Sequence, residues 1–249
     1  MLTMIEHGEV AEISLNRPPV NAMNLDFLEA VIKAHAEVVD AGARAVVISG
    51  REGLFSAGLD VRELLPADRG QIVHFWKRFF VLMSSLAGSP VPVAAAITGH
   101  SPAGGAVLAL HCDYRVATRG DYRIGLNEVQ VGLPVPPSIL YMLELVVGPR
   151  QAMLLASTGT LLSPEEALQV GFVDALAGSG EAAGEAVKWC EQLLRLPQQA
   201  MNTTRQAARA SIIERAQENE QYAETAADYW FSEETQQMMR QLVANLDKK

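Results

Sequence analysis

A single carboxylate stands in a stretch of the sequence that is otherwise apolar, amide-bearing or small. Glu128 lies in "IGLNEVQVGLP", residues 124–134, among isoleucine, leucine, valine, glycine and proline. Burying an unpaired carboxylate is costly, so an acid in this setting needs a reason. In an apolar pocket its pKa rises, and the carboxylate can then take a proton from carbon. The alternative is a structural acid paired with an arginine such as Arg123.

Two short stretches rich in small residues offer a complementary chemistry. They are "FSAGLD", residues 55–60, and "PAGGAVLAL", residues 102–110. Their glycines allow tight turns and let a ligand approach backbone N–H groups. In the second stretch the glycines open a predicted helix, whose free N–H groups and positive dipole end face the same point. Two N–H groups converging on one oxygen form an oxyanion hole. Taken alone, either glycine run is better explained as a close-packed turn.

The segments that must position these residues alternate between strands and helices. Residues 2–7 and 10–16 have the period-two pattern of a hairpin. A helix is predicted from its N-cap, Asn24, to Gly42, and another over residues 71–86. Further strands are predicted at residues 44–49, 91–99, 112–118 and 122–126. This succession indicates an α/β core.

After Pro137 the pattern becomes helical, with no further strong strand. Ser163 begins one of these helices with a predicted capping box. The best linker candidate is "ALAGSGE", residues 175–181. We therefore expect a core of residues 1–175 followed by a helical region of residues 176–249.

Composition and charge narrow the class of protein. The 249 residues are 49% hydrophobic and 20% charged, which suits a globular chain with a large core. A net charge of −9 gives no basic stripe, so nucleic acid is not expected as a partner. No apolar run approaches the roughly 18 residues of a membrane span. Two cysteines without a CxxC pair, and an N-terminus without a signal core, lead us to expect a cytoplasmic protein without a metal site.

Together and at their spacing, these stretches resemble the crotonase family, also called the enoyl-CoA hydratase/isomerase superfamily. The resemblance runs from "NRPPVNAMN" through "FSAGLDVREL" and "GHSPAGGAVLALHCDYRVA" to "SPEEALQVGFVD". Within the family the motifs are most similar to 3,2-trans-enoyl-CoA isomerases (dodecenoyl-CoA isomerases). The resemblance implies an α/β fold of the ClpP/crotonase type, a spiral of ββα units with a helical C-terminal region. It also implies a homotrimer or hexamer, with residues 176–249 covering the pocket and forming trimer contacts.

The resemblance also implies roles for individual residues. The family's oxyanion donors fall on the N–H groups of Leu59 and Gly104, and the catalytic acid of the isomerases falls on Glu128. The residues implied to hold the acyl-CoA thioester are Ser56, Ala57, Gly58, Asp60, Arg62 and Asn127. Coenzyme A would arrive as part of the substrate, so no separate cofactor and no metal are expected.

One departure from the family's hydratases bears on the reaction. Hydratases carry a second glutamate three residues after the oxyanion glycine, where it helps to activate water, and this chain has Val107 there. Moving a double bond needs only one base, which takes a proton from C2 and returns it to C4. We therefore expect isomerisation of 3-enoyl-CoA to trans-2-enoyl-CoA in fatty acid β-oxidation.

Other functions remain open at this point. They are another crotonase chemistry, such as hydration, thioester hydrolysis or decarboxylation, and a noncatalytic relative that binds acyl-CoA or RNA. Retention of Glu128 and both glycine stretches disfavours a noncatalytic relative, and the acidic charge disfavours RNA. A serine nucleophile, Ser56 with His100 or His111, lacks the GxSxG elbow and an assigned acid.

Several residues also have structural explanations. Asp60 is explained slightly better as the cap of a turn or helix, and Arg62 equally well as a solvated side chain. His111 fits a hydrogen-bonded histidine at a helix end. Trp230 and Phe231 would line an acyl tunnel, form a subunit contact or simply pack.

Overall fold

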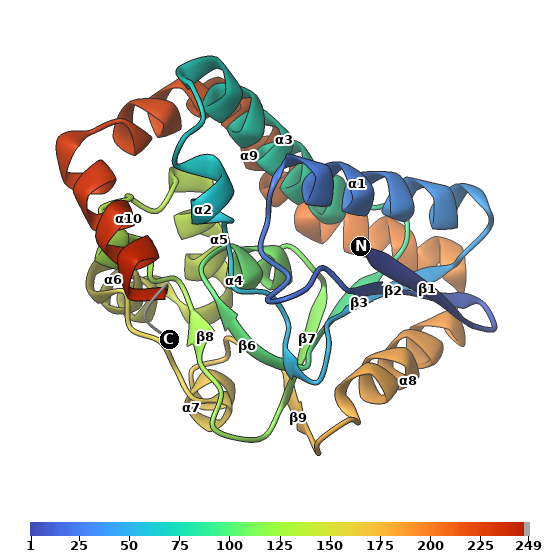
Figure 1. The fold of residues 1–249 in the computed structure, drawn as a ribbon. Coiled ribbons are helices and arrows are strands. Elements are labelled where there is room, and N and C mark those ends of the chain that lie inside the picture. Colours follow the sequence, from blue (N-terminus) through green and yellow to red (C-terminus); the bar gives the residue numbers. More distant parts are fainter. Residues whose placement is uncertain (247–249) are drawn as a thin grey trace.

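The computed structural model describes residues 1–246, apart from the side chains of residues 216–220. Its main sheet has six strands in the order β1-β2-β3-β5-β7-β9 (Figure 1). The first two strands form the predicted antiparallel hairpin, and the other neighbours pair in parallel. The strands are β1 Leu2–His7, β2 Val10–Leu15, β3 Ala45–Ser49, β5 Val93–Ile97, β7 Tyr114–Thr118 and β9 Ala175–Ala177.

Helices cover both faces of this sheet, which explains why β3 and β5 are buried along their whole length. Side chains alternate between the faces of a strand. Val46 and Ile48 belong to the main core, to which α1 (Leu25–Asp40) and α3 (Arg69–Ala87) contribute their apolar faces. Val47 points the other way, into a smaller cluster under α8. Helix α8 spans Ala182–Leu194.

A second, small parallel sheet has the order β4-β6-β8. Its strands are β4 Gly53–Leu54, β6 Gly99–Pro102 and β8 Ile124–Gly125. Each strand leads into one of the three motif stretches of the sequence. Because the carboxyl ends of parallel strands meet at one edge of a sheet, the three stretches are brought together there.

The ends of the predicted helices are fixed by local hydrogen bonds. The side chain of Asn24 accepts a hydrogen bond from the N–H of Phe27 at 2.9 Å, which caps α1 as predicted. Ser163 and Glu166 form the predicted capping box of α7 (Pro164–Gln169). One prediction is wrong: the first residues of the expected linker, Ala175–Ala177, form β9 at the edge of the main sheet. This strand has only three residues, two of them alanines, and glycines follow it. Its sequence therefore lacks the pattern of alternating apolar residues that would predict a strand.

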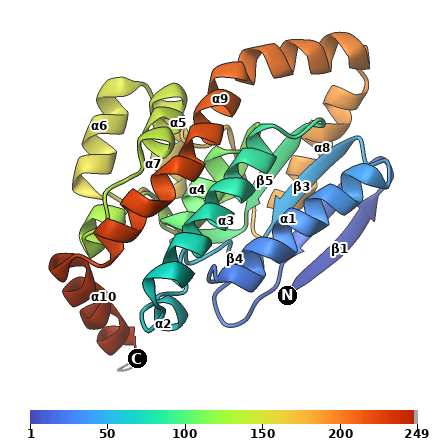
Figure 2. The ribbon, with the colours of Figure 1, turned by 90° about the horizontal axis from the view of Figure 1, so that it is seen from above.

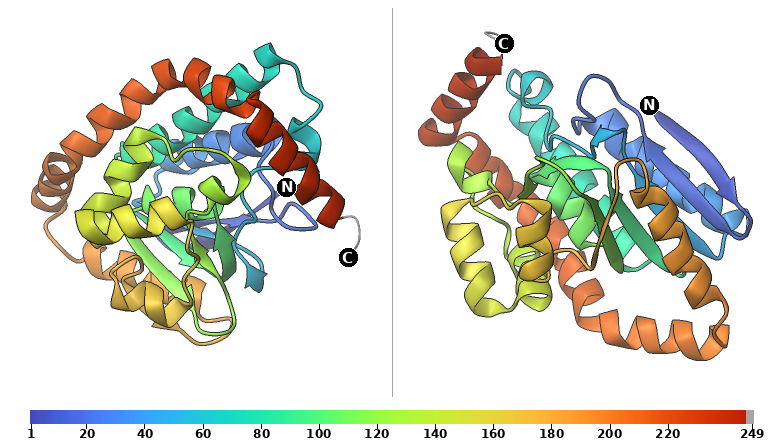
Figure 3. Two further views of the ribbon diagram at one scale, coloured as in Figure 1. Left: turned by 90° about the vertical axis from the view of Figure 1, so that its left-hand side faces the viewer. Right: turned by 90° about the horizontal axis from the view of Figure 1, so that it is seen from below.

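The C-terminal part of the described chain wraps around the core. The remaining helices are α2 Val61–Leu64, α4 Gly104–Leu110, α5 Pro137–Val147, α6 Pro149–Thr158, α9 Gln198–Trp230 and α10 Glu233–Leu246. The long α9 packs along α3, and the chain then turns back into α10 (Figures 2 and 3). Residues 247–249, which the helical prediction includes, lie outside the described residues. None of the described helices is long and apolar enough to cross a membrane.

Two arginines on α9 attach this helix to the core through Asp113, whose side chain is 10% exposed. Arg205 donates two hydrogen bonds of 2.8 Å to the carboxylate of Asp113, and Arg209 lies 3.1 Å from the same carboxylate. Asp113 also accepts a hydrogen bond from the N–H of Val93 at 2.8 Å. A buried ion pair adds little net stability, but it fixes the register of the elements that it joins.

Candidate active site

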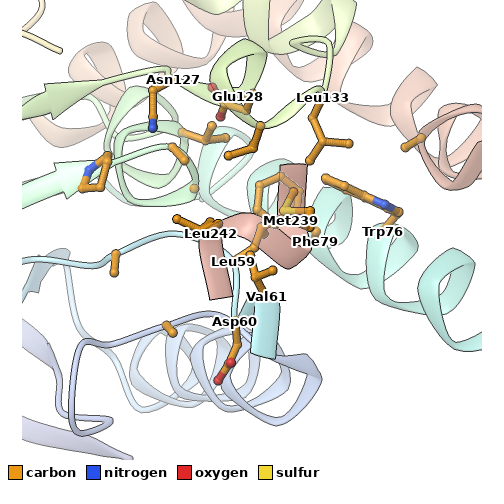
Figure 4. A pocket seen from close by; sticks show the side chains of 18 of the residues that line it. Leu59, Asp60, Val61, Trp76, Phe79, Asn127, Glu128, Leu133, Met239 and Leu242 are labelled. Carbon is orange, nitrogen blue, oxygen red and sulfur yellow. The ribbon is translucent and has the colours of Figure 1, made fainter. Parts of the chain in front are cut away.

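A cavity of about 560 Å³ lies where the small sheet ends and α3, α9 and α10 meet (Figure 4). Its wall near the small sheet includes Ala57, Leu59, Asp60, Arg62, Gly104, Val107, Asn127 and Glu128. The opposite, mainly apolar wall includes Trp76, Phe79, Leu133, Tyr222, Tyr229, Met239, Leu242 and Leu246. The size and the apolar lining suit a small-molecule site with a few polar groups.

The two glycine stretches touch each other at one wall of the cavity. A methyl group added to Gly58 would lie 3.1 Å from the backbone nitrogen of Gly104, and one added to Gly104 would lie 3.3 Å from the Cα of Gly58. Gly58 also has φ +83°, which favours glycine. The preceding residue of the second stretch, Ala103, adopts φ +46° at the start of α4. Such backbone strain is typical of positions held for function.

This contact brings two unused backbone donors to the same cavity. Among the residues described, the N–H groups of Leu59 and Gly104 donate to no acceptor in the chain. Gly104 is the first residue of α4, so its N–H has no partner within the helix. The flanking N–H groups are engaged, because Gly58 donates to the Ser56 hydroxyl and Asp60 to the Met23 carbonyl. The pair suits an oxygen that gains negative charge during a reaction.

Glu128 lies on the same wall of the cavity and begins the short 3₁₀ helix η1 (Glu128–Val131). Its Oε2 atom is buried and has no hydrogen-bond partner among the described residues. Burial raises the pKa of Glu128 to about 7, although its own backbone N–H acts in the opposite direction. Arg123 does not neutralise it, since Arg123 pairs with Asp121 at 2.8 Å. Glu128 is thus an unpaired acid on the cavity wall, which is the arrangement of a base rather than of an ion pair.

The sequence-predicted substrate residues divide into two groups. Ala57, Asp60, Arg62 and Asn127 line the cavity. Ser56 and Gly58 are not among its lining residues. The Ser56 side chain is fully buried, and its hydroxyl donates to the carbonyl of Asn21 at 2.8 Å, so it supports the turn from behind. Gly58 shapes the cavity wall indirectly, through its close contact with Gly104.

Asp60 is a helix cap, as the sequence slightly favours, and it also lies on the cavity wall. It caps α2 by accepting a hydrogen bond from the N–H of Glu63. Its second oxygen accepts a 2.7 Å hydrogen bond from Arg17, which also lines the cavity. Arg17 lies in "NRPPVNAMN", the first stretch of the family resemblance, but the sequence assigns it no role in the site.

The apolar wall is also missing from the sequence predictions. Trp76 and Phe79 come from α3, and Met239 and Leu242 come from α10. Figure 4 shows these side chains directed into the same space as Leu59 and Leu133. The aromatic pair suggested instead does not line it: Trp230 is buried in the core and Phe231 is 38% exposed. The amphipathic pattern of each helix is visible in the sequence, but the partner of its apolar face is not.

The histidine and serine alternatives are not supported by the geometry. His111 caps the end of α4, and its ring nitrogen lies 2.8 Å from the carbonyl of Val107. Burial lowers the pKa of His111 to about 4, so it is a neutral structural histidine. The hydroxyl of Ser56 is committed to Asn21. Within the described residues, no group of three or more His, Cys, Asp or Glu side chains is arranged to hold a metal ion.

The raised pKa of Glu128 predicts a pH-dependent penalty on stability. Below about pH 4 the carboxyl is neutral in both the folded and unfolded states. Between about pH 4.5 and 7 it ionises first in the unfolded state, so stability falls as pH rises, and the loss is complete above the folded-state pKa of about 7. We expect Glu128→Gln to be more stable than wild type at pH 8, by up to about 3 kcal/mol, and equally stable near pH 4.

Urea unfolding between pH 4 and 8.5 measures this difference. Glu191→Gln is the matched control, since Glu191 is exposed on α8. A stability difference between Glu128→Gln and wild type that does not change with pH would contradict a buried, unpaired Glu128.

Comparisons with known proteins identify relatives of this chain. The chain matches the family model for enoyl-CoA hydratase/isomerase over residues 6–246. Human mitochondrial enoyl-CoA delta isomerase 1 is 36% identical over 209 residues, which are 83% of this chain and 69% of that protein. A putative enoyl-CoA hydratase of Thermus thermophilus is 32% identical over 213 residues, 82% of each chain. The crystal structure of human mitochondrial delta3-delta2-enoyl-CoA isomerase matches with a TM-score of 0.94 and 29% identity, over 99% of this chain and 98% of that one.

The fold is therefore that of the crotonases, as the three motifs predict. The chain belongs to the enoyl-CoA hydratase/isomerase family and is an enzyme of that family.

Proposed function

We propose that this protein isomerises 3-enoyl-CoA to trans-2-enoyl-CoA, with Glu128 as its only proton carrier. The observation that carries the proposal is the chemistry around the base. Glu128 is unpaired on the cavity wall, and Val107, at the position of the hydratases' second glutamate, is a buried apolar side chain on the same wall. One base suffices to move a double bond, whereas the second carboxylate that would help to activate water is missing.

The proposed reaction uses the two unused donors on the cavity wall. The thioester oxygen accepts hydrogen bonds from the N–H groups of Leu59 and Gly104. Glu128 removes a proton from C2, and the electrons of that C–H bond move toward the thioester oxygen to form a dienolate. The protonated Glu128 then returns the proton to C4, while the double bond shifts from C3–C4 to C2–C3. The two N–H groups stabilise the charge that develops on oxygen.

The apolar wall favours isomerisation over addition of water. Trp76, Phe79, Met239 and Leu242 supply hydrocarbon and aromatic surface where an acyl chain would lie. A dry site also keeps the pKa of Glu128 high, so that it is a stronger base than an exposed glutamate. Acyl-CoA thioesters are therefore the proposed substrates, and fatty acid β-oxidation is the proposed pathway.

The names of the relatives support two chemistries. The human relatives named above are delta isomerases, whereas the Thermus thermophilus relative is called a putative hydratase. Hydration of 2-enoyl-CoA is therefore the second candidate, and Val107 is the observation that places it second.

A product assay separates the two candidates. Purified protein is expected to convert 3-enoyl-CoA to trans-2-enoyl-CoA without added metal or redox cofactor, and to hydrate 2-enoyl-CoA poorly. Chromatography of the CoA products after incubation with each substrate measures both reactions. Efficient formation of 3-hydroxyacyl-CoA with negligible isomerisation would overturn the proposal.

We also propose that the protein assembles as a trimer, alone or paired as a hexamer. Helices α5, α6 and α7 expose the large apolar side chains Leu145, Met153, Leu154 and Leu168. Such side chains are suited to a subunit contact, and the C-terminal region is expected to add to it. Light scattering at micromolar concentration is expected to give a multiple of three chain masses, and a strict monomer would refute the assembly.

A further inference from the structure

The turn that carries Glu128 is held at two points by other parts of the chain. On one side, the Gln130 side chain donates a 2.9 Å hydrogen bond to the carbonyl of Gly159, at the end of α6. On the other side, η1 ends at Gly132, which has φ +78° and contacts α10. The position of Glu128 therefore depends on groups outside its own stretch.

One threonine of α10, Thr235, donates a hydrogen bond to this turn. Thr235 is fully buried, and its hydroxyl donates a 2.7 Å hydrogen bond to the carbonyl of Gly132. The fit is close, because a methyl group added to Gly132 would lie 3.0 Å from the Cα of Thr235. Ser232 donates to the same hydroxyl at 2.9 Å and accepts from the N–H of Thr235 at 3.2 Å, so the hydroxyl is oriented at the first turn of α10.

The face of α10 that carries Thr235 also closes the cavity. Met239, Leu242 and Leu246 follow Thr235 at helical spacing, and all three line the cavity. Figure 4 shows Met239 and Leu242 lining the same pocket as Glu128 and Leu133. Docking of this helix face thus both covers the acyl subsite and supports the turn of Glu128.

We propose that Thr235 is a positioning residue, which couples the docking of α10 over the cavity to the placement of Glu128. The inference rests on the proposed function, in which Glu128 is the base. Thr235 does not touch the substrate in this scheme. It fixes the residue at the end of η1, so the Glu128 carboxylate faces the cavity only when α10 is docked. Docking of α10 thus encloses the substrate and places the Glu128 carboxylate in the same step, and the enclosed dienolate is protected from water.

The electrostatics of the site give a readout that a merely structural role would not change. Burial raises the pKa of Glu128, and its own backbone N–H acts in the opposite direction. No neighbouring charge within the described residues contributes to the shift. The other ionisable side chains on the cavity wall are Arg17, Asp60, Arg62, Tyr222 and Tyr229. The charged side chains of α10 near η1, Glu233, Glu234 and Arg240, are exposed. A loosened turn would admit water to the carboxylate and lower its pKa.

The test compares hydroxyl-free, hydroxyl-bearing and control variants in the full-length protein. Thr235→Val removes the hydroxyl and keeps the branched shape, whereas Thr235→Ser keeps the hydroxyl. Gln236→Ala is the matched control, because Gln236 also donates from the first turn of α10 to a backbone carbonyl, that of Trp230, at 2.9 Å. The measurements are kcat and KM for 3-enoyl-CoA, the pH dependence of kcat/KM, and a carbon-13 NMR titration of the glutamate carboxyls, in which the Glu128 signal is assigned by its loss in Glu128→Gln.

In Thr235→Val we expect kcat to fall about 10-fold or more, because small misplacements of a catalytic group are costly. The pKa of Glu128 should move from about 7 toward the value of an exposed glutamate. Thr235→Ser should retain most of the wild-type kcat and pKa, and Gln236→Ala should retain the wild-type pKa. Wild-type kcat and pKa in folded Thr235→Val would overturn the proposal, as would equal effects of Thr235→Val and Gln236→Ala.

A second variant tests the same contact from its other side. In Gly132→Asn the new asparagine tolerates the positive φ of this position, but its Cβ would press against Thr235. This variant should reproduce the lower kcat and the lower pKa of Glu128. This variant decides the matter if Thr235→Val does not fold. Glu128→Gln, measured in parallel, separates the two hypotheses. Near-wild-type turnover in Glu128→Gln refutes Glu128 as the base, whereas loss of turnover there with normal Thr235→Val and Gly132→Asn refutes only the role of Thr235.

Discussion

Glu128→Gln is expected to lower turnover of 3-enoyl-CoA about 100-fold or more while changing acyl-CoA binding little. General-base catalysis contributes at least about this factor, and glutamine keeps the shape of the side chain without its basicity. Because Oε2 of Glu128 has no hydrogen-bond partner in the part of the chain that the structure describes, the substitution breaks no ion pair or hydrogen bond of that oxygen there. Steady-state kinetics gives turnover, and calorimetric titration with a saturated acyl-CoA gives binding.

The control for this experiment is again Glu191→Gln, an exposed acid on α8, which should have wild-type kinetics. If Glu128 is only structural, the loss will appear in thermal stability and binding rather than in turnover. Near-native turnover in folded Glu128→Gln excludes Glu128 as the base.

Gly104→Ala is expected to lower kcat about 100-fold, because it disturbs one of the two donors proposed to hold the thioester oxygen. The added methyl group would lie 3.1 Å from the sulfur of Met23 and 3.3 Å from the Cα of Gly58. The flexible Met23 side chain can move away from the added methyl group, but the Gly58 backbone cannot move without displacing the neighbouring N–H of Leu59. Since the effect is on charge that develops in the transition state, kcat should fall more than substrate affinity.

Gly184→Ala is the matched control for the added methyl group. Gly184 lies within α8, and a methyl group there meets no atom within 4 Å. Alanine at this helical position should leave kcat unchanged and raise stability by about 0.5–1 kcal/mol. A Gly104→Ala variant with unchanged kcat would argue against an oxyanion hole at this contact.

The parts of the fold that could be predicted from sequence are those with a strong local signal. The β1–β2 hairpin, the cap of α1 at Asn24 and the capping box at Ser163 each depend on residues close together in the chain. Strands β4 and β6 and the edge strand β9 are short and lack an alternating apolar pattern. Their pairing depends on partners distant in sequence, which no local pattern reveals.

The candidate site shows the same division. Glu128, Leu59 and Gly104 belong to three recognisable motifs, and the structure places all three on one cavity wall. Arg17 lies in a stretch of the resemblance, but its contact with Asp60 could not be predicted, because the two residues are 43 positions apart. The side chains of α3, α9 and α10 belong to no motif, and a helix pattern indicates an apolar face without showing what that face covers. The contact of Thr235 with Gly132 joins residues more than one hundred positions apart and could not be found without the fold.

The attachment of α9 to the core has a consequence for how substrate range can change during evolution. Asp113 holds the helix at Arg205 and Arg209, whereas the cavity is lined by Tyr222, Ala226 and Tyr229 farther along the same helix. At 1.5 Å per residue, the lining begins roughly 20 Å beyond the last arginine. Mutations that reshape the proposed acyl subsite therefore leave the contact of Asp113 with Arg205 and Arg209 intact. If the proposed function holds, related enzymes can diverge in chain-length preference by exchanging these side chains, without a new arrangement of the helix.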